Sequence, residues 1–210
     1  MDLNDDSLTV SGSGPIGGGG VLVVACGALA REILALIDAN GWSHITLTCL
    51  PAIYHNTPEK IVPAIREAVA KAEGKYVKVF VAYADCGTGG LLEAACRELG
   101  VDMIEGPHCY SFFEGNAEFA ARTEDDFRAF YLTDFLARQF DAFVTKPLGL
   151  DRHPELRDAY FGHYDKLIYL AQTEDEALTE QAKRAANFLG LSFERMFTGY
   201  GDLAVALKRV

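Results

Sequence analysis

The 210-residue chain is 50% hydrophobic and 23% charged, which is the ordinary balance of a globular protein that buries its own core. Thirty acidic against nineteen basic residues give a formal net charge of −11, which repels phosphate backbones and anionic membranes and excludes nucleic acid as an expected partner. The acidic start MDLNDD and the lack of an apolar run of about 20 residues predict a cytoplasmic chain without a signal peptide or a membrane span.

Residues 1–20, which end in SGSGPIGGGG, are predicted to form a flexible glycine-rich arm before a single α/β domain over residues 21–210. These glycines precede the first predicted strand, whereas a dinucleotide-binding fingerprint follows its strand, so nucleotide binding is not expected here. Apolar and amphipathic runs then alternate. The predicted strands of this first half are 21–26, 44–50, 77–84 and 101–105, and the predicted helices are 27–41, 58–74 and 89–100.

The second half of the chain continues the same alternation. Its predicted strands are 128–133, 166–172 and 191–199, and its predicted helices are 134–144, 154–160, 173–190 and 201–210. Because the strand runs are continuously apolar, we expect them to be buried on both faces, as parallel strands between two helical layers are. The pattern therefore predicts a three-layer α/β fold with a mostly parallel, twisted sheet of the Rossmann-like or flavodoxin-like kind.

Three cysteines and one histidine lie just past predicted strands, and these are Cys26, His55, Cys86 and Cys109. Because the carboxyl ends of parallel strands share one edge, the four side chains are expected to meet where open α/β sheets bind their ligands. In a chain without a secretory signal, an odd count of five cysteines favours free or metal-bound thiols over disulfides. Thiolate and imidazole ligands together predict a zinc site, or secondly an iron–sulfur cluster, formed by these four residues.

The segment YADCGTGG around Cys86 carries the most distinctive pattern of the chain. Its glycines Gly87, Gly89 and Gly90 allow close approach of a ligand and open a predicted helix, so their amides are candidate cofactor contacts. The alternative interpretation is a tight turn that needs glycine for its geometry. Glu32 lies in the predicted helix that directly follows Cys26. It is a second candidate catalytic residue, in addition to Cys86, or a metal ligand, and the alternative interpretation is a solvated helix carboxylate.

Two further functions stay open at this stage. In the first, the protein is a metal-free cysteine enzyme in which Cys86 is the nucleophile, the glycine-loop amides form an anion hole, and His55 or His108 is the base. In the second, it is a non-enzymatic module that docks a cofactor or a methyltransferase partner. Cys49 and Cys96 lie inside a predicted strand and a predicted helix, and we interpret both as small apolar core residues.

Four motifs in order resemble the domain of unknown function 1638 family: VACGALAREI, LPAIYHNTPEKI, VAYADCGTGG and GPHCYSFFEGN. Later segments, HYDKLIYLAQ and TGYGDLAVAL, extend the resemblance over roughly residues 21–207. The family pattern has an acidic residue before its last cysteine, where this chain has His108 before Cys109. The resemblance implies a role near corrinoid-dependent methyl transfer in one-carbon metabolism, with a small molecule or a corrinoid protein as the partner.

Overall fold

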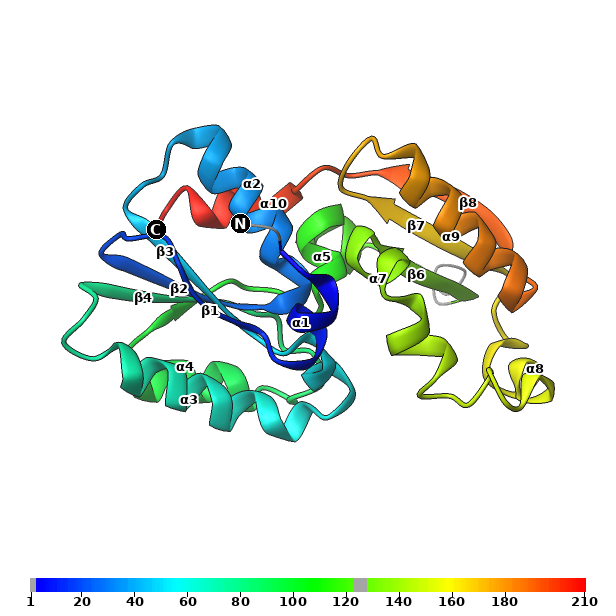
Figure 1. The fold of residues 1–210 in the computed structure, drawn as a ribbon, viewed down its shortest axis with the longest axis horizontal. Coiled ribbons are helices and arrows are strands. Elements are labelled where there is room, and N and C mark those ends of the chain that lie inside the picture. Colours follow the sequence, from blue (N-terminus) through cyan, green and yellow to red (C-terminus); the bar gives the residue numbers. More distant parts are fainter. Residues whose placement is uncertain (1–2, 123–127) are drawn as a thin grey trace. The chain divides into compact units, whose positions relative to one another are not determined.

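The computed structural model describes residues 3–122 and 128–210, and the chain divides into two compact units (Figure 1). The first unit comprises the chain up to Phe112 together with Asp202–Val210, and the second comprises Phe113–Gly201. Both units are α/β, and all strand pairs but one are parallel, which confirms the predicted fold class. The prediction of a single domain over residues 21–210 did not anticipate that the strands form two separate sheets.

The sheet of the first unit has five strands in the order β1-β3-β2-β4-β5. Their bounds are β1 Ser13–Ile16, β2 Val21–Cys26, β3 Ile45–Leu50, β4 Lys78–Ala82 and β5 Asp102–Met103. Strand β2 lies at the centre and is almost entirely buried, because its run VLVVAC offers an apolar side chain to each face of the sheet. Parallel pairing of β2 with β3 places Cys26 opposite Leu50, at the carboxyl ends of both strands.

Helices cover both faces of this sheet. The main ones are α2 Ala30–Asn40, α3 Ile61–Ala72, α4 Leu91–Leu99 and α10 Gly201–Leu207. Figure 1 shows α3 and α4 on one face and α2 and α10 on the other, as a three-layer fold requires. Ile33 of α2 and Ile61 and Ile65 of α3 are completely buried, so each helix turns its apolar stripe towards the strands. Helix α2 ends at Gly41 in a left-handed conformation (φ 63°), the usual helix stop.

The prediction of a flexible arm over residues 1–20 is wrong for the part that the structure describes. Helix α1, Asp5–Val10, is capped by the Asn4 side chain, and strand β1 pairs antiparallel with β3. The glycines allow close approach of backbone to backbone, because a Cβ on Gly12 would overlap the carbonyl oxygen of Cys49 and one on Gly19 that of His44. The glycine-rich composition predicted a flexible segment, whereas in the structure these residues include a strand that pairs with β3.

The second unit contains a three-stranded parallel sheet in the order β6-β7-β8, with bounds Ala129–Thr133, Lys166–Ala171 and Ser192–Phe197. Its helices are α6 Asn116–Ala120, α7 Asp134–Arg138, α8 Arg157–Phe161 and α9 Glu176–Leu189, and α5 Cys109–Glu114 precedes them. The predicted helix 134–144 is shorter than expected, because α7 ends at Arg138 and a separate π-helical turn spans Asp141–Thr145. Among the helices that the structure describes, none has the length and apolar character to cross a membrane.

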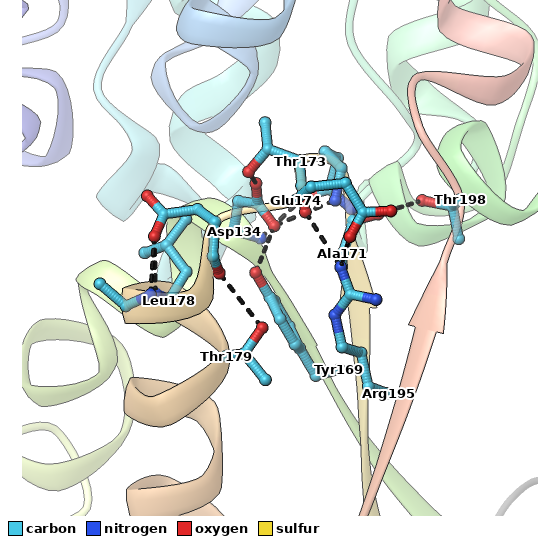
Figure 2. A network of polar contacts seen from close by, with 12 residues as sticks. Asp134, Tyr169, Ala171, Thr173, Glu174, Leu178, Thr179, Arg195 and Thr198 are labelled. Atoms are coloured by element: carbon cyan, nitrogen blue, oxygen red, sulfur yellow. Dashed lines mark hydrogen bonds and ion pairs between the residues drawn. The ribbon is translucent and has the colours of Figure 1, made fainter.

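A buried carboxylate holds the carboxyl ends of β6 and β7 together (Figure 2). Asp134 is 1% exposed, and its Oδ1 accepts hydrogen bonds from the Tyr169 hydroxyl (2.7 Å) and from the Gln172 amide N–H (3.0 Å). Its Oδ2 accepts a bond from the Thr173 hydroxyl (2.6 Å). The Asp134 N–H donates in return to the Gln172 side-chain oxygen (2.7 Å). The charge is therefore buried with both oxygens satisfied, as a stable buried carboxylate requires.

Candidate functional site

The crevice between the carboxyl ends of β2 and β4 is the topological switch point of the first sheet. From β2 the chain continues to β3 on one side of this crevice, and from β4 it continues to β5 on the other side. The intervening helices accordingly lie on opposite faces, α2 on one and α3 and α4 on the other (Figure 1). Open α/β sheets bind ligands at such a point, because the departing loops leave a gap there. Cys26 ends β2 and Cys86 lies in the loop after β4, so both flank this crevice.

Three of the four predicted ligands come together at this edge. Burial, followed by the charge of Cys26, raises the pKa of Cys86 to about 12. Burial, followed by the charges of Cys86 and Cys26, raises the pKa of Cys109 well above its ordinary value. Burial also raises the pKa of Cys26, although a hydrogen bond from the Ala28 amide opposes it. We name Cys26, Cys86 and Cys109 the thiol cluster, since each thiol responds to the charge of a neighbour.

Backbone hydrogen bonds fix the loop that carries Cys86. The amides of Asp85 and Cys86 donate to the carbonyls of Gly106 (3.3 Å) and Pro107 (3.1 Å), and the Cys109 amide donates to the Cys86 thiol. Cys86 adopts φ 46°, the one positive φ of a non-glycine residue in the described part of the chain. A left-handed conformation costs a residue with a Cβ about 1–2 kcal/mol. Such local strain concentrates at functional sites, where the surrounding structure maintains it.

The glycine loop after Cys86 is organised around the Asp85 carboxylate. That carboxylate accepts hydrogen bonds from the Thr88 hydroxyl (2.5 Å) and from the amides of Gly90 (2.8 Å) and Gly89 (3.1 Å). Burial alone would raise the pKa of Asp85, but these bonds and the charge of His108 lower it. Two amides are thus already used inside the loop, and Gly87, Gly89 and Gly90 all have positive φ. The turn alone explains these glycines, and their role as cofactor contacts stays a prediction.

Two buried polar side chains join the thiol cluster. Glu32 is only 3% exposed, so the alternative of a solvated helix carboxylate is wrong, and its charge contributes to the raised pKa values of Cys26 and Cys109. Tyr83 is 1% exposed, and burial together with the charges of the three thiols raises its pKa. Its hydroxyl lies beside the Cys26 thiol and has no nitrogen or oxygen partner among the described residues. Sequence reasoning missed Tyr83, since a tyrosine at the end of VKVFVAY reads as strand core.

His55 lies in a 3-10 turn, Ala52–Asn56, and its strongest electrostatic neighbour is a second histidine. Burial, followed by the charge of His108, lowers the pKa of His55. His108 in turn helps to lower the pKa of Asp85. His108 thus connects His55 to Asp85, the residue before Cys86. No thiol is among the groups that shift the pKa of His55. The role of His55 as a metal ligand stays a prediction.

The two remaining cysteines lie where they were expected. Cys49 in β3 and Cys96 in α4 are buried in the core, and burial raises the pKa of Cys49 to about 12. Among the residues that the structure describes, no three His, Cys, Asp or Glu side chains already stand in an arrangement that holds a metal ion.

The chain matches one protein-family model, that of the protein of unknown function DUF1638, over residues 49–207. The match contains His55, Cys86 and Cys109, and begins after Cys26 and Glu32. Neither the curated proteins nor the solved structures contain a significant match. Because the family model covers well over half of its residues, the chain belongs to the DUF1638 family.

Proposed function

We propose that the thiol cluster binds a soft metal ion, zinc first and an iron–sulfur cluster second. The observation that supports this is the meeting of Cys26, Cys86 and Cys109 at the switch crevice of the sheet. Thiolates are the ligands that zinc and iron–sulfur clusters prefer. The three residues come from the end of β2, the loop after β4 and the start of α5, so the fold itself assembles the set, as it does in functional rather than finger-like sites.

The raised pKa values favour this proposal over a metal-free cysteine enzyme. A nucleophilic cysteine needs a thiolate near neutral pH, and burial raises the pKa of all three thiols instead. A bound divalent cation reverses that balance, because it supplies the positive charge that buried thiolates lack. Metal binding would then release the thiol protons and turn the side chains towards a common point.

The fourth metal ligand is either His55 or Glu32. His55 offers an imidazole whose pKa is lowered, so it is neutral and able to coordinate. Glu32 offers a buried carboxylate that already interacts with Cys26 and Cys109. A closed set of four ligands suits a structural or carrier role, whereas three thiols with a displaceable fourth group suit catalysis.

A zinc ion in this crevice would supply a Lewis acid that activates a thiol substrate or polarises a carbonyl. Our proposal of a role beside corrinoid-dependent methyl transfer follows from the family resemblance, with a small molecule or a corrinoid protein as the partner. Cys86, Glu32 and the loop amides of Gly87, Gly89 and Gly90 are the chain's own groups nearest to such a substrate. A non-enzymatic accessory role in the same system is the alternative.

Metal analysis of the protein purified without oxygen tests the proposal. We expect near-stoichiometric zinc or iron, and loss of most of it in each of Cys26→Ser, Cys86→Ser and Cys109→Ser. Cys96→Ser is the control, since Cys96 is a buried cysteine that, like Cys86, has little exposure but lies outside the thiol cluster. Protein that contains no metal and takes up no added zinc, while one of the three thiols alkylates rapidly, would contradict the proposal and support the metal-free enzyme.

The fourth ligand is identified by two further variants. Glu32→Gln and His55→Gln each remove one candidate ligand while keeping a side chain of similar size. Loss of a group that only orients a ligand weakens metal binding about 10–100-fold, so we expect the variant that removes the ligand itself to weaken zinc binding by at least that much and the other variant to have a smaller effect. The absorption spectrum of the cobalt-substituted protein then gives the number of thiolate ligands, which we expect to be three in both variants.

A further inference from the structure

A separate pocket of about 350 Å³ lies in the second unit, between α9 and the segment that joins α7 to the π-helical turn. This volume is at the small end of the range for ligand sites, about 300–1,000 Å³. Phe140 and Phe188 lie on its wall with their rings edge to face, 6.1 Å between centroids. Ala137 and Ala185 leave the space open between the two helical segments.

Polar groups of both kinds line the same pocket. Arg138 and Arg184 bring two guanidinium groups, and the Nε and Nη2 atoms of Arg138 are buried. Asp141 adds a carboxylate, so the wall of the pocket carries both cationic and anionic side chains. The side-chain oxygen of Gln181 is buried and has no hydrogen-bond partner among the described residues. A buried acceptor without a partner lowers the stability of the fold by about 1–3 kcal/mol. A ligand that donates a hydrogen bond to this oxygen would remove that cost.

The π-helical turn determines which side chains reach this pocket. The amide of Lys146 donates to the Asp141 carbonyl (2.9 Å), and that of Leu150 donates to the Thr145 carbonyl (2.8 Å), five residues apart in both cases. A π-helical turn rotates the following side chains relative to an α-helix, and such turns are frequent at functional sites. Here both Asp141 and Thr145 lie on the pocket wall.

We propose that this pocket binds a free α-amino acid with an apolar side chain. The carboxylate of the ligand would pair with Arg138 and Arg184, because guanidinium groups match carboxylates in charge and geometry. Its ammonium group would donate to the Gln181 oxygen and to Asp141. Its side chain would pack on Phe140 and Phe188. An uncharged hydrocarbon meets only the aromatic wall, and a plain carboxylate leaves the Gln181 oxygen without a donor.

Calorimetric titration with L-phenylalanine and two analogues tests the ligand class. Phenylalaninamide lacks the carboxylate, and 3-phenylpropionate lacks the ammonium group. We expect saturable binding of L-phenylalanine with Kd about 1 mM or tighter, and at least about tenfold weaker binding of each analogue, equal to 1.4 kcal/mol. Absence of saturable binding overturns the proposal, and so does 3-phenylpropionate binding as tightly as the amino acid.

Two substitutions on α9, with a third as control, test whether the ligand binds in this pocket. Arg184→Met should weaken binding of L-phenylalanine about tenfold or more, whereas Lys183→Met, a neighbouring cation that pairs with Glu180 and does not line the pocket, should leave it unchanged. Gln181→Leu should abolish binding while the urea midpoint of unfolding stays the same or rises, because it removes an unsatisfied acceptor. Unchanged affinity in Gln181→Leu, or equal losses in the two cation variants, refutes the proposed site.

Discussion

The two sheets treat polar side chains at their carboxyl ends in opposite ways. In the first sheet the strand order reverses between β2 and β4, and the thiol cluster meets Glu32 and the Tyr83 hydroxyl there. In the second sheet β6, β7 and β8 follow one another without reversal, and Asp134 occupies the same edge. The carboxylate of Asp134 is saturated with hydrogen bonds (Figure 2), whereas the Tyr83 hydroxyl has no nitrogen or oxygen partner within the described part of the chain.

This difference separates a group that stabilises the fold from groups that we propose to bind a metal ion. A buried polar network whose members are all satisfied fixes the loops that it joins. The raised pKa values keep the thiols at the other edge neutral, so they pack as small apolar groups, and the strained backbone at Cys86 opposes stability. We therefore expect substitutions at the Asp134 edge to change the free energy of unfolding, and substitutions at the thiol edge to change it little.

The largest effect is expected from Asp134→Ala. This substitution removes an acceptor from Tyr169, Gln172 and Thr173 and leaves buried donors without partners, so unfolding should become easier by about 3–5 kcal/mol. Urea unfolding measures the change. Asp151→Ala, at an exposed aspartate of the same unit, is the control and should change stability by no more than about 0.5 kcal/mol. A similarly small loss for Asp134→Ala would contradict the stabilising role of the network.

The same substitution at two buried tyrosines compares the edges directly. Tyr169→Phe removes a hydrogen bond to a buried carboxylate and should cost about 1.5–3 kcal/mol. Tyr83→Phe removes a hydroxyl that lies beside the Cys26 sulfur, a weak acceptor, and should change stability by about 0.5 kcal/mol or less. Thermal or urea unfolding of the metal-free protein measures both. Equal losses at the two positions would remove the contrast between the edges.

The smallest effect concerns the strain at Cys86. Because φ is 46° there, Cys86→Gly should be about 1 kcal/mol more stable than Cys86→Ala. Cys26 has an ordinary φ of −68°, so the order should reverse, with Cys26→Ala more stable than Cys26→Gly by about 0.5–1 kcal/mol. Both pairs are compared by urea unfolding. The same order at both positions would show that Cys86 carries no backbone strain.

The strands and the thiol cluster could be predicted from the sequence because both depend on local pattern. Continuous apolar runs such as VLVVAC specify buried strands, and parallel strands bring their carboxyl ends to one edge wherever the helices lie. Cys26, Cys86 and Cys109 follow from that rule alone. The division into two sheets does not follow from it, since the runs say that strands are buried but not which strands pair.

The buried polar groups could not be predicted, because their partners are distant in the sequence. Asp134 follows a strand as many helix-capping residues do, and its burial depends on Tyr169, 35 residues further on. Glu32 has a helical spacing that suits solvent equally well, and only the structure shows that its side chain is buried near Cys26 and Cys109. His55 was predicted beside the thiols, and the one charged group that shifts its pKa is His108, which directly precedes Cys109.

The antiparallel strand β1 has a consequence for how copies of the chain behave towards one another. A strand at the margin of a sheet offers unpaired amide and carbonyl groups to any second strand, which is the usual route to polymerisation. β1 occupies that margin along β3, and β5 at the opposite margin spans only Asp102–Met103. Both edge strands are short, four residues in β1 and two in β5, so either margin offers a second copy of the chain only a few unpaired backbone groups.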